Sequence, residues 1–191
     1  MREEAVWIVI LLTDGAANAA TQATPPATFN DWICPASTYS GGPEPLPPYC
    51  RDDSAGTRHL LSSPEFDADD YARNMADFVG CPYPNPSLPQ PPGCASTAPG
   101  GQGAVIFTIG LGSNVISNPD DPGEPRAGEF LLRYAAAVGD DGDPDTDFCT
   151  LPNPDVGPGL DCGNYYYSPS GAGLIRVFEA IASRIFTRIT H

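Results

Sequence analysis

An acidic side chain at the end of an apolar segment is the residue of this sequence best placed to do chemistry. Asp14 follows the apolar run Val6–Leu12 and stands between Thr13 and Gly15. If that run is a strand, the carboxylate lies at the sheet edge where α/β proteins bind ligands. Carboxylate oxygens bind hard divalent cations, so Asp14 is a candidate metal ligand, with Thr13 and Gly15 supporting its loop. The alternative is an aspartate that only begins a turn.

A second group of carboxylates lies in the acidic segment 140–147. Alternating carboxylates can converge on one calcium ion. The segment departs from the EF-hand pattern, because its sixth position is not glycine and Pro152 stands where the closing glutamate belongs. A solvated acidic loop is therefore the alternative to a calcium loop. The candidate ligands of a calcium loop are Asp141, Asp143, Asp145 and Asp147.

Six cysteines occur among turn-forming residues, and no two of them form a CxxC pair. With only two histidines in the chain, a zinc site of the usual spacing has little support. We favour disulfides, and hence an oxidising, extracytoplasmic compartment, over six free thiols in a cytosolic protein, because these stretches hold few apolar neighbours. Sequence proximity predicts the pairs Cys34–Cys50, Cys81–Cys94 and Cys149–Cys162, although other pairings stay open.

The composition excludes several classes of function. The chain has 24 acidic and 9 basic residues, and its formal charge of -15 disfavours nucleic acid as a partner. The longest apolar run, Ala5–Leu12, is too short to cross a bilayer, which needs about 20 residues; we predict a strand there, with a secretory signal as the alternative. Neither GxSxG nor HExxH occurs, so we predict no enzyme, with an unrecognised secreted hydrolase as the alternative.

Apolar periodicity predicts strands and helices in alternation along the chain. Three apolar segments are typical of strands, and three segments with one apolar face are typical of helices. This order favours an α/β, Rossmann-like fold, with a parallel sheet and helices on both faces. The predicted strands are Val6–Leu12, Ala104–Ile109 and Tyr165–Tyr167, and the predicted helices are Asp69–Val79, Glu129–Val138 and Leu174–Ile189.

Some side chains have predicted positions within these elements. The run Val6–Leu12 is apolar without alternation, which predicts a strand covered on both faces. Gly139 is predicted to cap the second helix, and Tyr166 to lie in the core. The first predicted helix has an apolar face formed by Tyr71, Met75, Phe78 and Val79. The last predicted helix has a basic outer face formed by Arg176, Arg184 and Arg188.

Several blocks of the sequence, in the right order, resemble the C-terminal half of a von Willebrand factor type A domain. These blocks are LLTDG, FTIGLG, LLRYAAAVG and GNYYYSPSGAGLIRVFEAIASRI. Among type A domains the chain looks most similar to bacterial surface proteins of the tight-adherence pilus-assembly kind. The resemblance implies one partial domain over residues 1–191. Its core would comprise residues 1–19, 65–80, 104–139 and 163–191, with disulfide-bearing insertions at 20–64, 81–103 and 140–162.

The resemblance also implies a metal site of which this chain carries one part. The family holds a magnesium, manganese or calcium ion with an Asp-x-Ser-x-Ser segment, a threonine from another loop, and an aspartate that Asp14 matches. The segment Asp52–Gly56 has glycine in place of the last serine and follows no apolar strand, so we interpret it as a decoy. We therefore expect a fragment whose first strand has an open apolar edge. Mg²⁺ or Ca²⁺ would bind well only if a missing N-terminal half completes the site.

These expectations together favour a non-enzymatic function in protein binding or adhesion. The chain would be a fragment of a bacterial cell-surface or pilus-assembly type A domain, located outside the cytoplasm. Its partner would be a protein ligand or its own missing N-terminal half. The alternative is a secreted, calcium-stabilised structural module that uses the acidic loop 140–147.

Overall fold

Three parallel strands form the centre of the molecule. The computed structural model describes residues 6–15, 68–82, 94, 101–118, 125–142, 147–150 and 156–189. The strands are β1 (Ile8–Thr13), β2 (Val105–Leu111) and β3 (Tyr165–Ser168). The helices are α2 (Ala68–Gly80), α3 (Ala127–Val138) and α4 (Leu174–Ile189), with short 3-10 turns η3 (Ser113–Val115) and η4 (Gly171–Gly173). Strands and helices alternate, as the sequence predicts.

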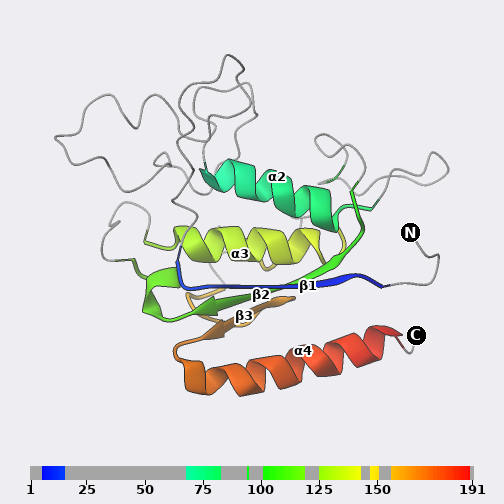
Figure 1. Cartoon of the computed structure of the whole chain (residues 1–191). Coiled ribbons are helices and arrows are strands. Elements are labelled where there is room, and N and C mark those ends of the chain that lie inside the picture. Colours follow the sequence, from blue (N-terminus) through cyan, green and yellow to red (C-terminus); the bar gives the residue numbers. More distant parts are fainter. Residues whose placement is uncertain are drawn as a thin grey trace, which may run out of the picture.

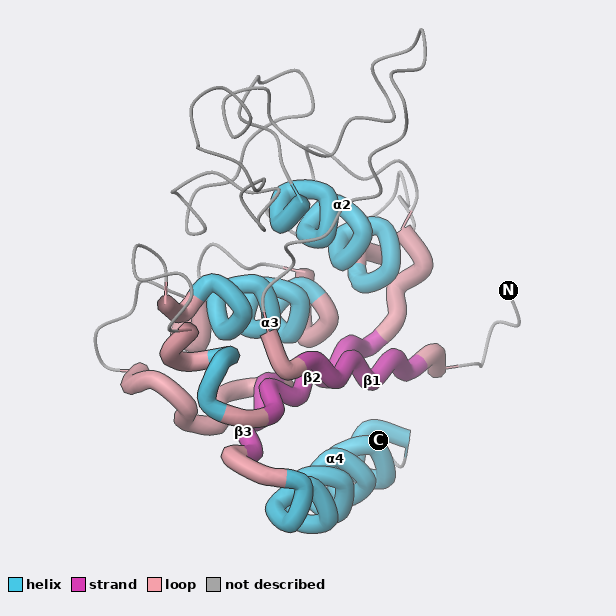
Figure 2. Tube along the Cα trace, turned by 60° about the vertical axis from the view of Figure 1, so that its left-hand side comes forward, coloured by secondary structure: helices cyan, strands magenta, loops and turns pink. Residues whose placement is uncertain are grey.

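The strands lie in the order β1-β2-β3, and both neighbouring pairs are parallel. Helices α2 and α3 lie on one face of the sheet and α4 lies on the other (Figure 1; Figure 2). The predicted α/β, Rossmann-like fold is therefore confirmed. None of the described helices is both long enough and apolar enough to span a membrane.

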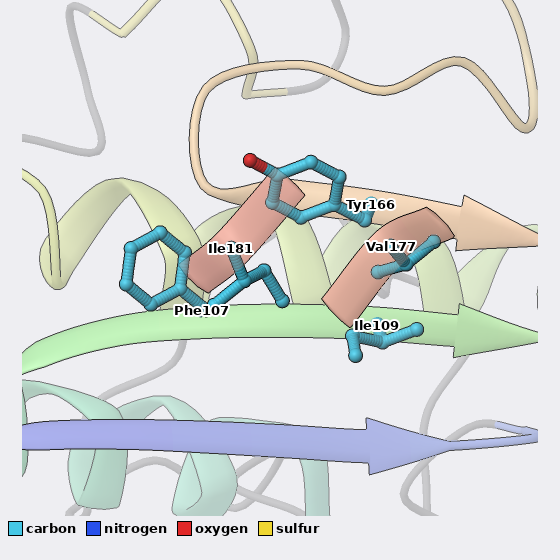
Figure 3. Packing of buried hydrophobic residues seen from close by; sticks show 5 residues of the cluster. All are labelled: Phe107, Ile109, Tyr166, Val177 and Ile181. Carbon is cyan, nitrogen blue, oxygen red and sulfur yellow. The ribbon is translucent and has the colours of Figure 1, made fainter. Parts of the chain in front are cut away.

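The face of the sheet toward α4 carries a compact apolar core. Phe107 and Ile109 of β2 and Tyr166 of β3 pack against Val177 and Ile181 of α4 (Figure 3). These residues recur at every second position of the strands and at helical spacing in α4, so each element presents one face to the other. The prediction that Tyr166 lies in the core is confirmed.

The opposite face of the sheet packs against α3. Leu132 and Ala136 of α3 lie against Tyr165 of β3 and Val115 of η3. The hydroxyl of the fully buried Thr108 in β2 donates a hydrogen bond to the backbone oxygen of Leu132 (2.9 Å), which fixes the helix on the sheet. A polar β2 side chain is thus satisfied inside an otherwise apolar layer.

Gly139 follows α3 as its C-cap residue, as predicted, but for a different reason. Its φ of -77° is open to any residue, so no left-handed conformation requires glycine. A Cβ atom at this position would lie 2.4 Å from the backbone nitrogen of Ile106 in β2. Close approach of the helix end to the strand therefore requires glycine here.

Helix α2 packs with its polar face inward. Asp69, Arg73 and Asp77 are buried, and the hydroxyl of Tyr134 in α3 donates to the Asp77 carboxylate (2.8 Å). Arg73 forms an ion pair with Asp69 (2.9 Å) and lies over the Tyr134 ring. The predicted apolar face of this helix is instead largely exposed at Tyr71, Met75 and Phe78.

The prediction that Val6–Leu12 is covered on both faces is wrong. The segment forms the parallel strand that was expected, but β1 lies at the edge of the described sheet. Four consecutive apolar side chains of the strand are 38–44% exposed, namely Val9, Ile10, Leu11 and Leu12. The apolar composition correctly indicated a parallel strand. Burial of its side chains would also need a second neighbouring strand and helices over both faces, which are absent from the described residues. Among the described residues no strand pairs with the outer side of β1, in line with the expected open apolar edge.

Candidate functional site

The carboxyl ends of the three strands meet at one edge of the sheet. Thr13 at the end of β1 pairs with Gly110 of β2, and Leu111 of β2 pairs with Ser168 of β3. The backbone nitrogen of Gly112 donates to the Ser168 oxygen (2.8 Å), so the loops after β2 and β3 are held together. This is the edge at which ligands of α/β proteins bind.

Asp14 lies at this edge, directly after β1, and its side chain is exposed. The neighbouring Thr13 hydroxyl donates to the Gly15 backbone oxygen (3.2 Å) and accepts from the Gly15 nitrogen (3.3 Å). The structure therefore shows Thr13 and Gly15 closing a small turn beside the carboxylate. Whether that turn supports a metal ligand stays a prediction.

The described residues do not fit a complete metal site around Asp14. Among them, no three His, Cys, Asp or Glu side chains come together in an arrangement that could hold a metal ion. Calcium takes six to eight oxygen ligands and magnesium a near-octahedral set, so a single carboxylate holds neither ion tightly. Tight binding would need oxygen ligands from other residues or from a partner. The segment Asp52–Gly56 lies outside the described residues.

The acidic segment 140–147 is described only at its two ends. Asp140 pairs with Arg188 of α4, and Asp141 is exposed. At the other end, the Asp147 carboxylate accepts a hydrogen bond from the Cys149 nitrogen (2.7 Å), so it organises a local turn. The remaining two candidate calcium ligands, Asp143 and Asp145, lie outside the described residues.

Two of the three predicted disulfides are present. Cys81 is bonded to Cys94 and packs against the end of α3, while Cys149 is bonded to Cys162 in the segment that precedes β3. Each closes a short loop, as proximity in the sequence predicts. The predicted pair Cys34–Cys50 lies outside the described residues. Two disulfides in one domain are typical of an oxidising compartment.

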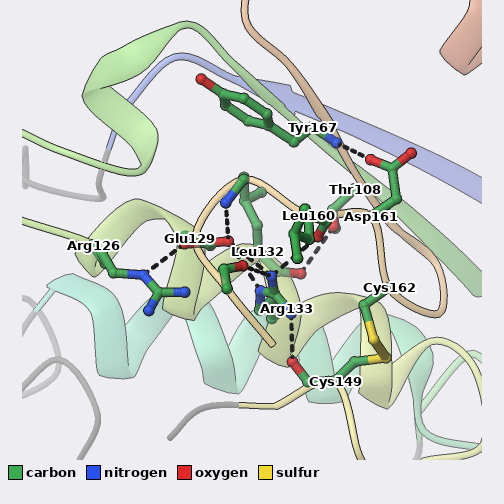
Figure 4. Close-up of polar contacts among 12 residues, drawn as sticks. Thr108, Arg126, Glu129, Leu132, Arg133, Cys149, Leu160, Asp161, Cys162 and Tyr167 are labelled. Carbon is green, nitrogen blue, oxygen red and sulfur yellow. Dashed lines mark hydrogen bonds and ion pairs between the residues drawn. A yellow bond between two sulfur atoms is a disulfide. The ribbon is translucent and has the colours of Figure 1, made fainter. Parts of the chain in front are cut away.

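A buried ion pair, which the sequence did not lead us to predict, joins α3 to the segment before β3. The guanidinium of Arg133 and the carboxylate of Glu129 are both fully buried and 2.9 Å apart (Figure 4). Arg133 also donates to the backbone oxygens of Cys149 (3.2 Å) and Leu160 (3.0 Å). The Glu129 carboxylate accepts further hydrogen bonds from Arg126 (2.8 Å) and from the Gly159 nitrogen (3.0 Å).

These contacts make the Glu129–Arg133 pair a structural connection. Apart from the side chain of Arg126, the residue just before α3, its partners outside the helix are backbone groups. Together with the Cys149–Cys162 disulfide, the pair holds the segment before β3 against the helix (Figure 4). The sequence does contain a pattern that could have indicated this ion pair. Glu129 and Arg133 are four residues apart in a helix whose other residues are mostly apolar. Opposite charges on a buried helix face must pair with each other.

Burial also alters the acidity of the tyrosines in β3. Burial raises the pKa of Tyr165 well above its ordinary value of 10.0, and the Glu129 carboxylate adds to the increase. Burial likewise raises the pKa values of Tyr166 and Tyr167. The Tyr165 hydroxyl is buried and finds no hydrogen-bond partner in the structure. It therefore stays neutral near pH 7.

The exposed side chains of β1 are apolar. In a parallel strand both backbone polar groups of a residue point to the same side, and the Trp7 oxygen accepts a hydrogen bond from Val105 of β2. Alternation then turns the backbone groups of Ile8, Ile10 and Leu12 toward the open side of β1. We call the exposed side chains of β1, together with this row of backbone groups, the β1 edge.

Helices α2 and α4 also expose apolar side chains. Figure 2 shows α2 above and α4 below the sheet on the side of β1. Helix α2 exposes its apolar face, and α4 exposes apolar residues beyond those that contact the sheet. The exposed members are Tyr71, Met75 and Phe78 of α2 and Ile175, Phe178 and Phe186 of α4. These helices therefore expose apolar side chains in addition to those of β1.

Comparison with known proteins identifies no relative. No family model, curated protein or solved structure matches this chain. What the structure establishes is an α/β domain with three parallel strands and flanking helices.

Proposed function

We propose that this chain is a non-enzymatic protein-binding module of the type A kind, located outside the cytoplasm. The observation that supports it best is the β1 edge. Four consecutive apolar side chains and a row of backbone groups are open to solvent on an element whose composition suits burial. The two disulfides support an extracytoplasmic location, in line with bacterial surface or pilus-assembly proteins.

The site at the carboxyl edge of the sheet has a secondary part in this proposal. Asp14 lies at the end of β1, next to the proposed protein-binding surface. A bound polypeptide, whether a protein ligand or further sequence of the same type A domain, would bring additional oxygen ligands to Asp14. Without it, the described residues supply one carboxylate, and Mg²⁺ or Ca²⁺ is held weakly.

Calorimetric titration with Mg²⁺ and with Ca²⁺ tests the metal part of the proposal. The chain alone should bind both ions weakly, and Asp14→Asn should leave the titration unchanged within error. Asp141→Asn is the matched control, because Asp141 is also exposed and lies in the acidic segment. Tight binding that Asp14→Asn removes would show that the chain completes its own metal site. Tight binding removed by Asp141→Asn would instead favour the calcium-stabilised module.

Turnover assays test the non-enzymatic part. We expect no hydrolysis of generic ester or peptide substrates above the buffer rate, because the sequence contains neither the GxSxG nor the HExxH pattern. Turnover that copurifies with the folded chain would contradict the proposal.

A further inference from the structure

We propose that the Cys149–Cys162 disulfide is a redox-controlled latch. When the bond forms, it fixes residues 156–162 against α3, and when the bond is reduced, it releases them. We call residues 156–162 the latch segment; Cys162 is its last residue, and the disulfide joins it to Cys149. The inference goes beyond the proposed function and does not depend on it.

The latch segment supplies backbone partners to the buried charges of α3. The guanidinium of Arg133 donates to the backbone oxygens of Gly157 (3.2 Å) and Leu160 (3.0 Å). The backbone nitrogen of Gly159 donates to the Glu129 carboxylate (3.0 Å). Both charged side chains are fully buried, so these backbone groups take the place of water around the two charges. Hydrogen bonds to charged groups are stronger than neutral ones, so they hold the segment on the helix.

The ion pair contacts the chain on both sides of the disulfide. Arg133 also donates to the backbone oxygen of Cys149 (3.2 Å), the other half of the covalent bond (Figure 4). Cys162 in turn exchanges two backbone hydrogen bonds with Tyr165 of β3 (2.9 and 3.0 Å). The disulfide therefore joins the two stretches of chain that contact the ion pair, at the point where β3 begins.

The disulfide and the ion pair stabilise each other. A covalent bond across a short loop reduces the chain entropy that is lost when the segment binds to α3. By linkage, the contacts that hold the segment on α3 also keep the two sulfur atoms close together, and they favour the oxidised state. The redox state of the cysteines and the position of the latch segment are therefore coupled.

The sheet has contacts of its own that do not involve the latch segment. Strand β3 pairs with β2, and Tyr166 of β3 packs against α4. The Thr108 hydroxyl of β2 donates to the Leu132 oxygen of α3. None of these contacts uses residues 156–162. Release of the latch segment is therefore a local opening, and the sheet stays folded.

The two described disulfides differ in their access to solvent. Cys81 and Cys94 are 1% and 4% exposed and pack against Val138 of α3. Cys149 is also buried, whereas Cys162 is partly exposed. Thiol–disulfide exchange needs contact between an attacking thiolate and a sulfur atom of the disulfide. Of the two bonds, Cys149–Cys162 is therefore the one that a reductant reaches first.

Opening is an exchange with a dithiol. A thiolate of the dithiol attacks the Cys162 sulfur, the bond to Cys149 breaks, and Cys149 leaves as a thiolate that takes up a proton. The second thiol of the reagent then attacks the mixed disulfide and releases Cys162. The protein gains two electrons and two protons, and the dithiol becomes a disulfide. Closure is the reverse reaction, in which a small-molecule or protein disulfide is the oxidant.

Graded reduction of the folded, oxidised chain with dithiothreitol tests the latch. Acid quenching, alkylation of free thiols and peptide mass spectrometry identify the reduced pair at each concentration, and we expect Cys149–Cys162 to be reduced well before Cys81–Cys94. Amide exchange of the same samples measures the opening. The Gly159 amide should lose its protection, while the Val105 amide, which donates to the Trp7 oxygen across the sheet, should keep it. Reoxidation with glutathione disulfide should restore the Gly159 protection.

A variant of the ion pair tests the coupling. Glu129→Leu/Arg133→Leu should shift the thiol–disulfide equilibrium of Cys149–Cys162 toward the thiols by at least about tenfold, because the hydrogen bonds to charged groups are lost. The equilibrium of Cys81–Cys94 should not change. Arg176→Leu/Glu179→Leu is the matched control, since it removes two opposite charges that are exposed on α4. It should leave both equilibria unchanged.

Three results would overturn the inference. Reduction of both disulfides together, or of Cys81–Cys94 first, would show that Cys149–Cys162 is not the accessible bond. A Gly159 amide that stays protected after Cys149–Cys162 is reduced would show that the segment is not released. Simultaneous loss of protection at Gly159 and Val105 would make the bond a staple of the whole domain. If the double variant does not fold, the reduction order and these two amides in the parent chain decide the question.

Discussion

The two edge strands of the described sheet, β1 and β3, are both rich in apolar or aromatic residues but differ in burial. At β3 the strand is covered on both faces, by α4 through Tyr166 and by α3 through Tyr165, and both tyrosines are buried. At β1 an even more apolar strand is exposed on both faces. The β3 end is further fixed by a buried ion pair and a disulfide, whereas β1 is joined to the described domain mainly by its pairing with β2. Apolar composition therefore identifies a strand whose side chains would be stabilised by burial. Whether they are buried depends on the neighbouring strands and helices.

The strongest test of this contrast removes the charge pair from the β3 end. Arg133→Leu should lower the free energy of unfolding by about 3 to 5 kcal/mol, because it leaves the Glu129 carboxylate buried with less compensation. Chemical denaturation with the disulfides intact measures the change. The double variant Glu129→Leu/Arg133→Leu should recover part of the loss, since it removes both charges together. A single variant as stable as the parent would contradict a structural role for the pair.

A second test compares two residues that are partners in the sheet register. Leu12 of β1 pairs with Ile109 of β2 on the face toward α4; Ile109 is fully buried and Leu12 is 44% exposed. Ile109→Ala should destabilise the domain by about 2 to 5 kcal/mol, because a buried side chain leaves a cavity. Leu12→Ala should reduce stability by about 1 kcal/mol, in proportion to its partial burial.

Both variants should be measured at the same low protein concentration, so that the comparison reports the folding of the chain alone. Equal losses at the two positions would show that β1 is covered in solution, which would remove the difference between the two ends of the sheet.

The smallest expected effect concerns the buried Tyr165 hydroxyl at alkaline pH. The pKa of Tyr165 in the folded state is raised above its unfolded value of about 10, so the folded state holds this proton more tightly than the unfolded state does. The free energy of unfolding is therefore unaffected by this group below pH 10 and falls as the pH rises above 10. Tyr165→Phe should remove this residue's contribution to the loss and should leave stability near pH 7 unchanged or slightly higher, since the hydroxyl has no hydrogen-bond partner in the structure. Thermal unfolding at pH 7 and above pH 10 measures both effects. An unchanged alkaline loss in Tyr165→Phe would assign it to other groups.

Sequence patterns were sufficient for the elements of the fold because the required signals are local. The periodicity of apolar residues placed α4 at its observed bounds and placed β2, β3 and α3 within a few residues. Short loops between cysteines indicated Cys81–Cys94 and Cys149–Cys162. These features depend on residues that are close together in the sequence, so they can be read from the sequence alone.

Burial could not be predicted in the same way, because it depends on contacts between distant segments. The exposed face of α2 has the apolar composition that is typical of a buried face. Its inward face carries Asp69, Arg73 and Asp77; Asp69 pairs with Arg73, and Asp77 accepts a hydrogen bond from Tyr134 of α3. The apolar pattern of β1 likewise contains no information on whether a second strand lies beside it. Asp14 follows β1 at the carboxyl edge of the sheet, as the sequence predicts, and its role as a metal ligand stays a prediction.

Amide hydrogen exchange along β1, measured on dilute protein, tests the central claim most directly. If the β1 edge is open in the monomer, the amides of Ile8, Ile10 and Leu12 exchange quickly, while those of Val9 and Leu11, which point to β2, are protected. Equal protection of all five amides in the dilute monomer would contradict the account, because it would mean that the outer side of β1 is already hydrogen-bonded.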